Sequence, residues 1–410
     1  MQEYSPQSVK SLLEETVENS LEGMLREGAR RMLQAALEME VSTYIDQCKT
    51  QVNEQGHRQV VRHGHHARRK VITGVGPIPI QQPRVHDRRR GLQFTSAILP
   101  PYLRRTPSID ALIPALYLKG VSTSQFPEAL SAILGEGVSG LSSANIVRLK
   151  SIWEEEYTAW QKRDLTGKHY VYIWADGIYF NVRLSPERPC VLVIMGATAD
   201  GRKELIAIED GQRESKLSWQ AVLQDLKARG LIHAPAVAVG DGALGFWAAL
   251  GEAYPATQHQ RCWVHKTANV LDKLPKSQQA KAKEMIQQMY RADIQEEALD
   301  QYDQFIALFE PKHPKACDCL EKDKDALFTF YDFPAHHWRH LRTTNPIEST
   351  FATLRHRTRQ TKGCGSRKAT LMMVYKLAAE AEKKWQRLHG SAWLAKVVEG
   401  VVFVDGIMKK

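Results

Sequence analysis

The first hydrophobic pattern along the chain has the period of a helix. Apolar residues such as Leu21, Met32 and Met39 recur at steps of three and four positions through residues 7–46, with Glu and Arg between them. Such spacing places them on one face of an α-helix. We therefore predict an N-terminal helical region over residues 1–50, whose apolar face packs on a core or forms a dimer.

A basic segment follows at residues 56–90. It holds nine Lys and Arg and five His against one Asp. Its densest basic positions are Arg68, Arg69, Lys70, Arg88, Arg89 and Arg90. Between these ends, residues 71–80 combine β-branched residues with Gly and Pro, which predicts a short hairpin or a small sheet with basic edges. Such a cluster is an electrostatic footprint for phosphate, and a solvated loop is the alternative.

Three short helices separated by Gly-containing turns are predicted next. Their ranges are 109–118, 124–134 and 143–153. This is the outline of a helix-turn-helix, although ordinary helical bundles share it. The third helix offers Asn145, Arg148 and Lys150 to DNA. We predict that residues 51–160 form a DNA-binding region, the basic β segment followed by this helix-turn-helix-like part, and that 162–169 is a linker.

From residue 170 on, strand-like and helix-like segments alternate, which is typical of an α/β fold. Residues 170–175 and 178–184 are predicted as two strands joined by a tight Asp-Gly turn at 176–177, and 190–197 as an apolar third strand. Further strands are predicted at 205–208, 236–239 and 257–261, and helices at 214–229, 242–252, 264–274, 345–361 and 370–388. Residues 276–330 contain no strand-like run and are predicted to be helical.

Composition excludes several classes of protein. The chain has 410 residues, 43% apolar and 25% charged, which fits two or three folded domains and excludes global disorder, collagen and a coiled-coil rod. No apolar run predicts a membrane helix, and the first residues lack the pattern of a signal peptide. Six irregularly spaced Cys favour a reduced, cytoplasmic setting. The net charge of +10 favours a polyanionic partner, but only weakly.

Three acids stand at the ends of predicted elements, where a site can form. Asp176 and Asp241 each follow a strand, and Glu348 stands near the start of a helix. Neighbouring strand ends converge at one edge of a sheet, and a helix packed there can add a third acid. Clustered carboxylates repel, and hard divalent cations such as Mg²⁺ or Mn²⁺ offset that repulsion. Two such ions clamp the attacking and leaving oxygens of a phosphodiester exchange.

Each acid also has a purely structural interpretation. Asp176 belongs to the commonest hairpin dipeptide, and Asp241 can cap the helix that follows it. Glu348 stands three residues after Asn345, with Pro346 between them, which is the pattern of a capping box. Spacing alone therefore does not decide between a metal site and these structural roles.

Two competing motifs lie in the same region. Residues 240–245 match G-x-G-x-x-G after a strand, but Asp241 would point a carboxylate at the pyrophosphate and the expected acid about 20 residues later is missing, so we predict no nucleotide cofactor. Cys262 and His265 have half the spacing of a zinc site, without a matching second half. A packed Cys and a hydrogen-bonded His are the simpler interpretation of this pair.

A basic stripe follows the last acid. Arg355, Arg359 and Lys362 stand 7, 11 and 14 positions after Glu348, on the same face of the predicted helix. An acid at one end of a basic stripe fits metal chemistry on a nucleic-acid strand, and a solvated helix face is the alternative.

Together these blocks resemble the Mutator-type transposases of bacterial insertion sequences. The likeness rests on residues 174–180 (WADGIYF), 239–242 (VGDG), 260–269 (QRCWVHKTAN) and 341–349 (LRTTNPIES), with weaker likeness at 64–94 and 116–123. Their order and separation along nearly the whole chain make the resemblance specific.

The resemblance implies an α/β fold with a ribonuclease-H-like catalytic core, at residues 165–265 and 335–390, and an all-helical insertion at 266–334. It implies a DDE triad of Asp176, Asp241 and Glu348, acting with two Mg²⁺ ions for which Mn²⁺ can substitute. It also implies that Cys262 and His265 lie beside the site and help to hold DNA. Arg355 matches the family's basic residue seven positions after the Glu.

The sequence therefore predicts a transposase that binds the terminal inverted repeats of its element. Water would nick the end of the element, and the freed 3′-hydroxyl would attack target DNA. A homodimer is expected on double-stranded DNA, in a bacterial cytoplasm, associated with the nucleoid when bound. The alternatives are a non-catalytic DNA-binding regulator, which binds but does not nick, and a nucleotide-cofactor enzyme, which ignores DNA.

Overall fold

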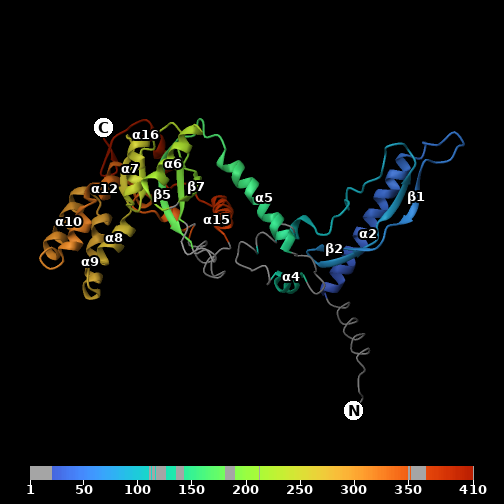
Figure 1. Cartoon of the computed structure of the whole chain (residues 1–410), viewed down its shortest axis with the longest axis horizontal. Coiled ribbons are helices and arrows are strands. Elements are labelled where there is room, and N and C mark those ends of the chain that lie inside the picture. Colours follow the sequence, from blue (N-terminus) through green and yellow to red (C-terminus); the bar gives the residue numbers. More distant parts are fainter. Residues whose placement is uncertain are drawn as a thin grey trace, which may run out of the picture. The chain divides into compact units, whose positions relative to one another are not determined.

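The computed structural model describes residues 21–109, 112, 116, 126–134, 143–180, 190–211, 213–349, 351 and 366–409. The chain divides into two compact units, Met1–Val147 and Arg148–Lys410, whose elements are labelled in Figure 1. Within the described ranges, no helix is long and apolar enough to cross a membrane.

The first unit is built on one long helix, α2 (Leu21–Gln47), packed on two short strand pairs. The helix buries Leu37 and Val41, and Leu37 packs with Val71, Ile78 and Leu99 in the core of the unit. The predicted helix is confirmed from residue 21 onward, and its start lies outside the described residues. Apolar side chains that stay exposed along α2 are Leu21, Met24, Leu25, Met32 and Met39. Dimerisation through this region stays a prediction.

The basic segment forms two separate two-stranded sheets, and one of them is the short hairpin that its pattern predicts. Two antiparallel pairs are nested in sequence: β1 (Val60–His65) pairs with β4 (Pro83–Asp87), and β2 (Arg69–Thr73) pairs with β3 (Gly76–Ile80). Gly76 has a φ of +101°, and a Cβ there would lie 2.8 Å from the Leu134 carbonyl oxygen, so the β2–β3 turn needs glycine.

The predicted helix-turn-helix is described only in part. Helix α4 (Phe126–Leu134) coincides with the second predicted helix, and α5 (Ser143–Gln161) runs past residue 153, the predicted end of the third. Most of the first predicted helix lies outside the described residues, as do the side chains at 145, 148 and 150. The motif therefore stays a prediction.

The second unit contains a five-stranded mixed sheet in the order β7-β6-β5-β8-β9. The strands are β5 (Tyr170–Tyr179), β6 (Cys190–Thr198), β7 (Lys203–Gly211), β8 (Val237–Gly240) and β9 (Gln258–Arg261). The β5–β6 and β6–β7 pairs are antiparallel, whereas β5–β8 and β8–β9 are parallel. Helical crossovers join the parallel strands, as such connections require.

Alternating side chains of the sheet form two separate cores. On one face, Ile173 and Ala175 pack with Trp219 of α6 (Lys216–Ala228) and Phe246 of α7 (Leu244–Ala253). On the other, Trp174 and other strand residues join a larger core that also includes residues of several helices. Among these helices are α8 (Trp263–Leu271), α9 (Lys276–Arg291), α10 (Gln295–Phe309), α11 (Pro314–Glu321) and α15 (Arg367–Glu382). Figure 1 shows α8, α9 and α10 grouped together.

One turn prediction is wrong. The Asp176-Gly177 pair does not join two strands, because β5 runs through it without interruption. Asp176 pairs with Val193 and Gly177 with Leu192 in one continuous antiparallel register. The register with β6 decides the local conformation here, although the dipeptide by itself favours a turn.

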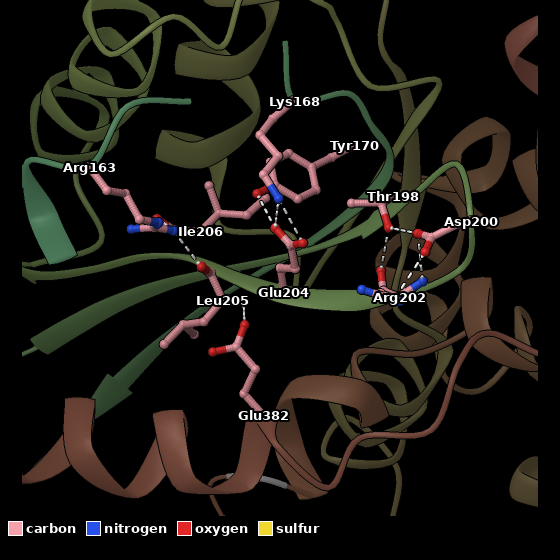
Figure 2. Close-up of polar contacts among 10 residues, drawn as sticks. All are labelled: Arg163, Lys168, Tyr170, Thr198, Asp200, Arg202, Glu204, Leu205, Ile206 and Glu382. Atoms are coloured by element: carbon pink, nitrogen blue, oxygen red, sulfur yellow. Dashed lines mark hydrogen bonds and ion pairs between the residues drawn. The ribbon is translucent and has the colours of Figure 1, made fainter. Parts of the chain in front are cut away.

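Strand β7 lies at the edge of the sheet, and side chains from elsewhere complete its hydrogen bonds (Figure 2). Its register with β6 shifts between Ile194 and Met195. Beside this irregularity, the Leu205 N–H donates to Glu382 Oε1 at 2.7 Å, and Arg163 donates to the Leu205 carbonyl oxygen at 2.6 Å. Blocking an edge in this way removes a template for unwanted strand pairing and docks α15 on the sheet.

Residues 276–330 are helical, as predicted, in α9, α10, α11 and the short α12 (Lys324–Phe328). The sequence pattern did not predict the ordered C-terminal part. There, helix α16 (Leu394–Val398) is followed by a hairpin of β10 (Phe403–Val404) and β11 (Ile407–Met408).

Candidate active site

The ends of three parallel strands bring three predicted site residues to one edge of the sheet. The last residues paired side by side on β5, β8 and β9 are Ala175, Gly240 and Arg261. Asp176, Asp241 and Cys262 come next on these strands, and the Cys262 N–H donates to the Gly240 carbonyl oxygen at 2.9 Å. Neighbouring strands lie about 4.8 Å apart. The sheet therefore places the three residues next to one another, as the sequence predicted for the two acids.

Asp176 is a buried acid in the middle of a strand. It stands between Trp174 and Ile178, which belong to the larger core, and only 5% of its surface is exposed. A carboxylate in such a place is costly unless other groups interact with it. The structural alternative, a turn residue, does not apply, because Asp176 lies inside β5.

Asp241 begins a tight turn out of β8. Its Oδ1 accepts from the Ala243 N–H at 3.0 Å, so one carboxylate oxygen fixes the turn. Helix α7 starts only at Leu244 and has no side-chain cap, so Asp241 is not the N-cap that the alternative proposed. Gly242 has a φ of +92°, and a Cβ there would lie 2.2 Å from Arg261 Cζ. This glycine is needed by the turn itself.

Glu348 lies in a polar cluster with Thr344, His265 and Cys262. Its Oε1 accepts from the Thr344 hydroxyl at 2.9 Å and lies 3.7 Å from His265 Nε2. The Thr344 N–H lies 3.4 Å from Cys262 Sγ. The capping-box alternative is not what forms, because the Asn345 N–H donates to the Thr343 hydroxyl. The Glu348 carboxylate is therefore directed towards α8 and its histidine.

His265 interacts electrostatically with Asp176 on β5 and with Glu348. Its hydrogen bond with Cys262, together with the charges of Cys262, Asp176 and Glu348, raises the pKa of His265 to about 9. Burial is the largest single influence on the pKa of Cys262 and raises it, but the hydrogen bonds and charge of His265, together with a hydrogen bond from Thr344, outweigh burial and leave that pKa below its usual value. At neutral pH the imidazole is therefore positively charged and lies between acids that would otherwise repel.

The side chains of Cys262, His265 and Glu348 also have the donors of a metal site. Their ligand atoms all lie within 4.8 Å of one another. Thiolate, imidazole and carboxylate together suit zinc-like ions rather than Mg²⁺. Cys262 is fully buried and already accepts hydrogen bonds from Thr344, so the interpretation as a packed Cys and a hydrogen-bonded His describes the contacts that are present.

A fourth acid, which the sequence analysis missed, lies at the same edge. Glu214 is half-buried just before α6, and burial, followed by the charges of Asp241 and Asp176, raises its pKa to about 7. His265 and a hydrogen bond from Tyr179 act in the opposite direction. No motif marks Glu214, and the only available signal was its place between a strand and a helix.

The predicted DNA-binding residues have different surroundings. Arg355, Arg359 and Lys362 lie outside the described residues, so their predicted role stays a prediction. In the first unit, the exposed basic residues among those predicted are Arg68, Lys70, Arg88 and Arg90. Arg69 is half-buried and donates to the carbonyl oxygens of Leu99 and Pro100.

Arg89 takes part in the folding of the first unit. Its guanidinium forms an ion pair with Asp87 at 2.6 Å and donates to Tyr44 and Gln51. Hydrogen bonds from Arg89 hold the pKa of Asp87 well below its usual range despite burial. Of the six basic residues of the first unit that were predicted to bind DNA, Arg89 is thus the one with the most internal partners.

Comparison with known proteins identifies the class. The family model "Transposase, Mutator family" matches residues 2–388. The transposase for insertion sequence element IST2 of Acidithiobacillus ferrooxidans is 50% identical over 287 residues, 68% of this chain and 95% of that protein. The transposase for IS6120 of Mycolicibacterium smegmatis is 50% identical over 298 residues, 73% and 92% respectively. The transposase for IS905 of Lactococcus lactis is 29% identical over 300 residues, 73% and 74%.

These matches show an insertion-sequence transposase, and therefore a DNA-processing enzyme. Within that class, the chain belongs to the Mutator family of transposases, as its sequence blocks indicated.

Proposed function

We propose that this transposase cuts and joins DNA with divalent metal ions held by Asp176, Asp241 and Glu348. The observation that carries the proposal is the common edge of β5 and β8, where Asp176 and Asp241, from distant parts of the chain, directly follow the last paired residues of the two strands. Glu348 is the third carboxylate. It is linked to Asp176 through His265, because both carboxylates raise the pKa of that histidine.

The donor set fits Mg²⁺ or Mn²⁺. Asp176 and Asp241 offer carboxylate oxygens, which hard divalent cations prefer. A bound ion of this kind supplies positive charge to the attacking and leaving oxygens of a phosphodiester. The protein's own part is to hold the acids in place: β5 fixes Asp176, the Ala243 N–H fixes one oxygen of Asp241, and Thr344 orients Glu348.

We further propose a ribonuclease-H-like core with a helical insertion. The strand order β7-β6-β5-β8-β9, with three antiparallel strands followed by two parallel ones, supports this proposal. So does the helical stretch between β9 and Glu348. A structure of the full chain bound to DNA and metal tests it, because the proposal expects the ends of β5 and β8 to lie at the scissile phosphate.

The first unit is proposed to bind the terminal inverted repeats. Four exposed basic side chains on or beside its strands support contact with phosphates: Arg68, Lys70, Arg88 and Arg90. Phosphate contacts give affinity, and base contacts by other residues supply the recognition of sequence. A homodimer on paired element ends is part of the same proposal.

Strand-resolved mapping of nicks tests the reaction. The full chain is incubated with Mg²⁺ and DNA that carries the ends of its element. We expect nicks at those ends, and we expect Asp176→Asn, Asp241→Asn and Glu348→Gln to lower nicking more than about 100-fold while DNA binding persists. Asp225→Asn is the matched control, because the exposed Asp225 pairs with Arg229 and not with a residue of the triad, so this change should leave nicking unchanged. Nicking that survives in any triad variant removes that acid from the proposal.

A further inference from the structure

The side chain of Glu214 lies against a position of β5 that has no side chain. Gly177, the residue after Asp176, belongs to the face of β5 that carries Ile173 and Ala175, opposite to Asp176. A Cβ at Gly177 would lie 2.3 Å from Cδ and 2.4 Å from Oε1 of Glu214. The carboxyl group of Glu214 therefore lies directly against the strand, in space that only a glycine leaves open.

The surrounding glycines and α7 hold Glu214 in this position. A Cβ at Gly245, in the first turn of α7, would lie 2.5 Å from the backbone carbonyl oxygen of Glu214. The Tyr179 hydroxyl donates a hydrogen bond to the Glu214 carboxylate from the same strand as Asp176. Backbone packing on one side and a tyrosine on the other fix both ends of this residue.

Folding does not explain why an acid stands here. The N-cap of α6 is Ser215, whose side chain accepts from the Ser218 N–H, so Glu214 is not needed as a cap. Glu214 instead adds negative charge to an edge that already holds Asp176 and Asp241, and both of them interact with it unfavourably. Residues that oppose stability in this way concentrate at functional sites.

We infer that Glu214 is a fourth carboxylate of the divalent-ion site, lying against Gly177 at the edge of the sheet that also holds Asp176 and Asp241. This inference rests on the proposed metal site and adds one residue to it. It explains why a crowded acidic edge is retained, since bound cations offset the repulsion among carboxylates. It also assigns a role to Gly177, because the absence of a side chain there leaves space for the Glu214 carboxyl group.

Binding of Mn²⁺ alone to the full chain, measured by calorimetry without DNA, tests the inference independently of activity. We expect Glu214→Gln to weaken Mn²⁺ binding at least about tenfold. The matched control is Glu209→Gln, because Glu209 is also half-buried in the second unit but lies two strands away from Gly177, across β6, and accepts a hydrogen bond from Gln161 at 2.7 Å. Glu209→Gln should bind Mn²⁺ like the unaltered chain.

Gly177→Ala gives a second variant that does not depend on the first. The three atoms nearest to the added methyl group all belong to the flexible side chain of Glu214, so the methyl group should displace that carboxyl group without unfolding β5. We expect a similar loss of Mn²⁺ affinity, and no further loss when Gly177→Ala is combined with Glu214→Gln, because both changes remove one interaction.

The outcomes separate the inference from the proposed function. If Asp241→Asn abolishes Mn²⁺ binding while Glu214→Gln binds like Glu209→Gln, the role of Glu214 is wrong and the metal site stands. If the unaltered chain binds no Mn²⁺, or Asp241→Asn binds it normally, the proposed metal site itself is wrong. An additive loss in the double variant also contradicts the inference, since Gly177→Ala would then act on another group.

Discussion

Nε2 of His265 lies 3.7 Å from Oε1 of Glu348, and the same imidazole is close enough to Asp176 for that carboxylate to raise its pKa. One positive charge thus interacts with both the first and the last acid of the proposed triad. It reduces the repulsion that these carboxylates exert on each other when no cation is bound. Since the Cys262 hydrogen bond contributes most to that pKa, α8 supplies both the charge and the group that maintains it.

The charge on His265 predicts a pH dependence of stability. Its pKa is raised from 6.5 to about 9 in the folded chain, so its contribution to stability is complete below about pH 6.5 and is lost as pH rises through 9. In metal-free buffer, the melting temperature of the unaltered chain should fall across this window more steeply than that of His265→Gln. Parallel curves for the two proteins would show that His265 does not carry this charge.

The exposed basic residues of the first unit predict a change in salt dependence. Replacing Arg68, Lys70, Arg88 or Arg90 by Ala should weaken binding to element ends. It should also lower the slope of log affinity against log salt by roughly 0.9 for each DNA phosphate that the replaced side chain no longer neutralises. Fluorescence anisotropy at several salt concentrations measures this slope. An unchanged slope in all four variants would show that DNA binds to another surface of the protein.

Arg89 is the internal control for that surface. Because its guanidinium contacts Asp87, Tyr44 and Gln51, Arg89→Ala should destabilise the first unit. Thermal unfolding separates this effect from a direct effect on DNA binding. A variant with normal stability and a reduced salt slope would instead place Arg89 among the residues that bind phosphate.

The buried charges behind the site predict a large effect on stability. Arg261 and Lys266 are almost fully buried, and both contact Asp323 Oδ2, at 3.1 and 2.5 Å. Burial raises the pKa of Asp323, but the two cations outweigh it and leave that pKa lowered. Asp323→Asn removes the charge that compensates them, and we expect a loss of about 3–5 kcal/mol in the free energy of unfolding. Urea titration measures it, and a loss below about 1 kcal/mol would contradict this role.

The Asp-Gly dipeptide shows how far the sequence predicts the fold. Asp-Gly at 176–177 was predicted as a turn, but its pairing with β6 and the burial of its neighbours keep it extended. Asp405-Gly406, for which no turn was predicted, does form the β10–β11 hairpin, with φ values of 50° and 73°. Local preference is equal at the two sites, and long-range pairing, which a local pattern does not contain, decides between them.

The candidate site shows a similar division. Asp176 and Asp241 were predictable as a pair because both follow apolar strand-like runs, and parallel strands end at one edge. Glu214 was not predictable, because its approach depends on a missing side chain at Gly177 on another strand. The contact between His265 and Glu348 likewise depends on how α8 packs beside the residues near 344, which spacing does not reveal.

The edge of the sheet predicts a difference between two nearby glutamates of α15. Glu382 accepts the Leu205 N–H on β7, and its pKa is raised, mainly by burial (Figure 2). Glu382→Ala leaves a buried N–H without its partner and should lower the free energy of unfolding by about 1–3 kcal/mol. Glu382→Gln keeps an acceptor and should lose less. Glu380 pairs with Lys383 on the surface, so Glu380→Ala should change stability by at most about 1 kcal/mol. Equal losses for Glu382→Ala and Glu380→Ala in urea unfolding would show that this bond does not hold α15 against β7.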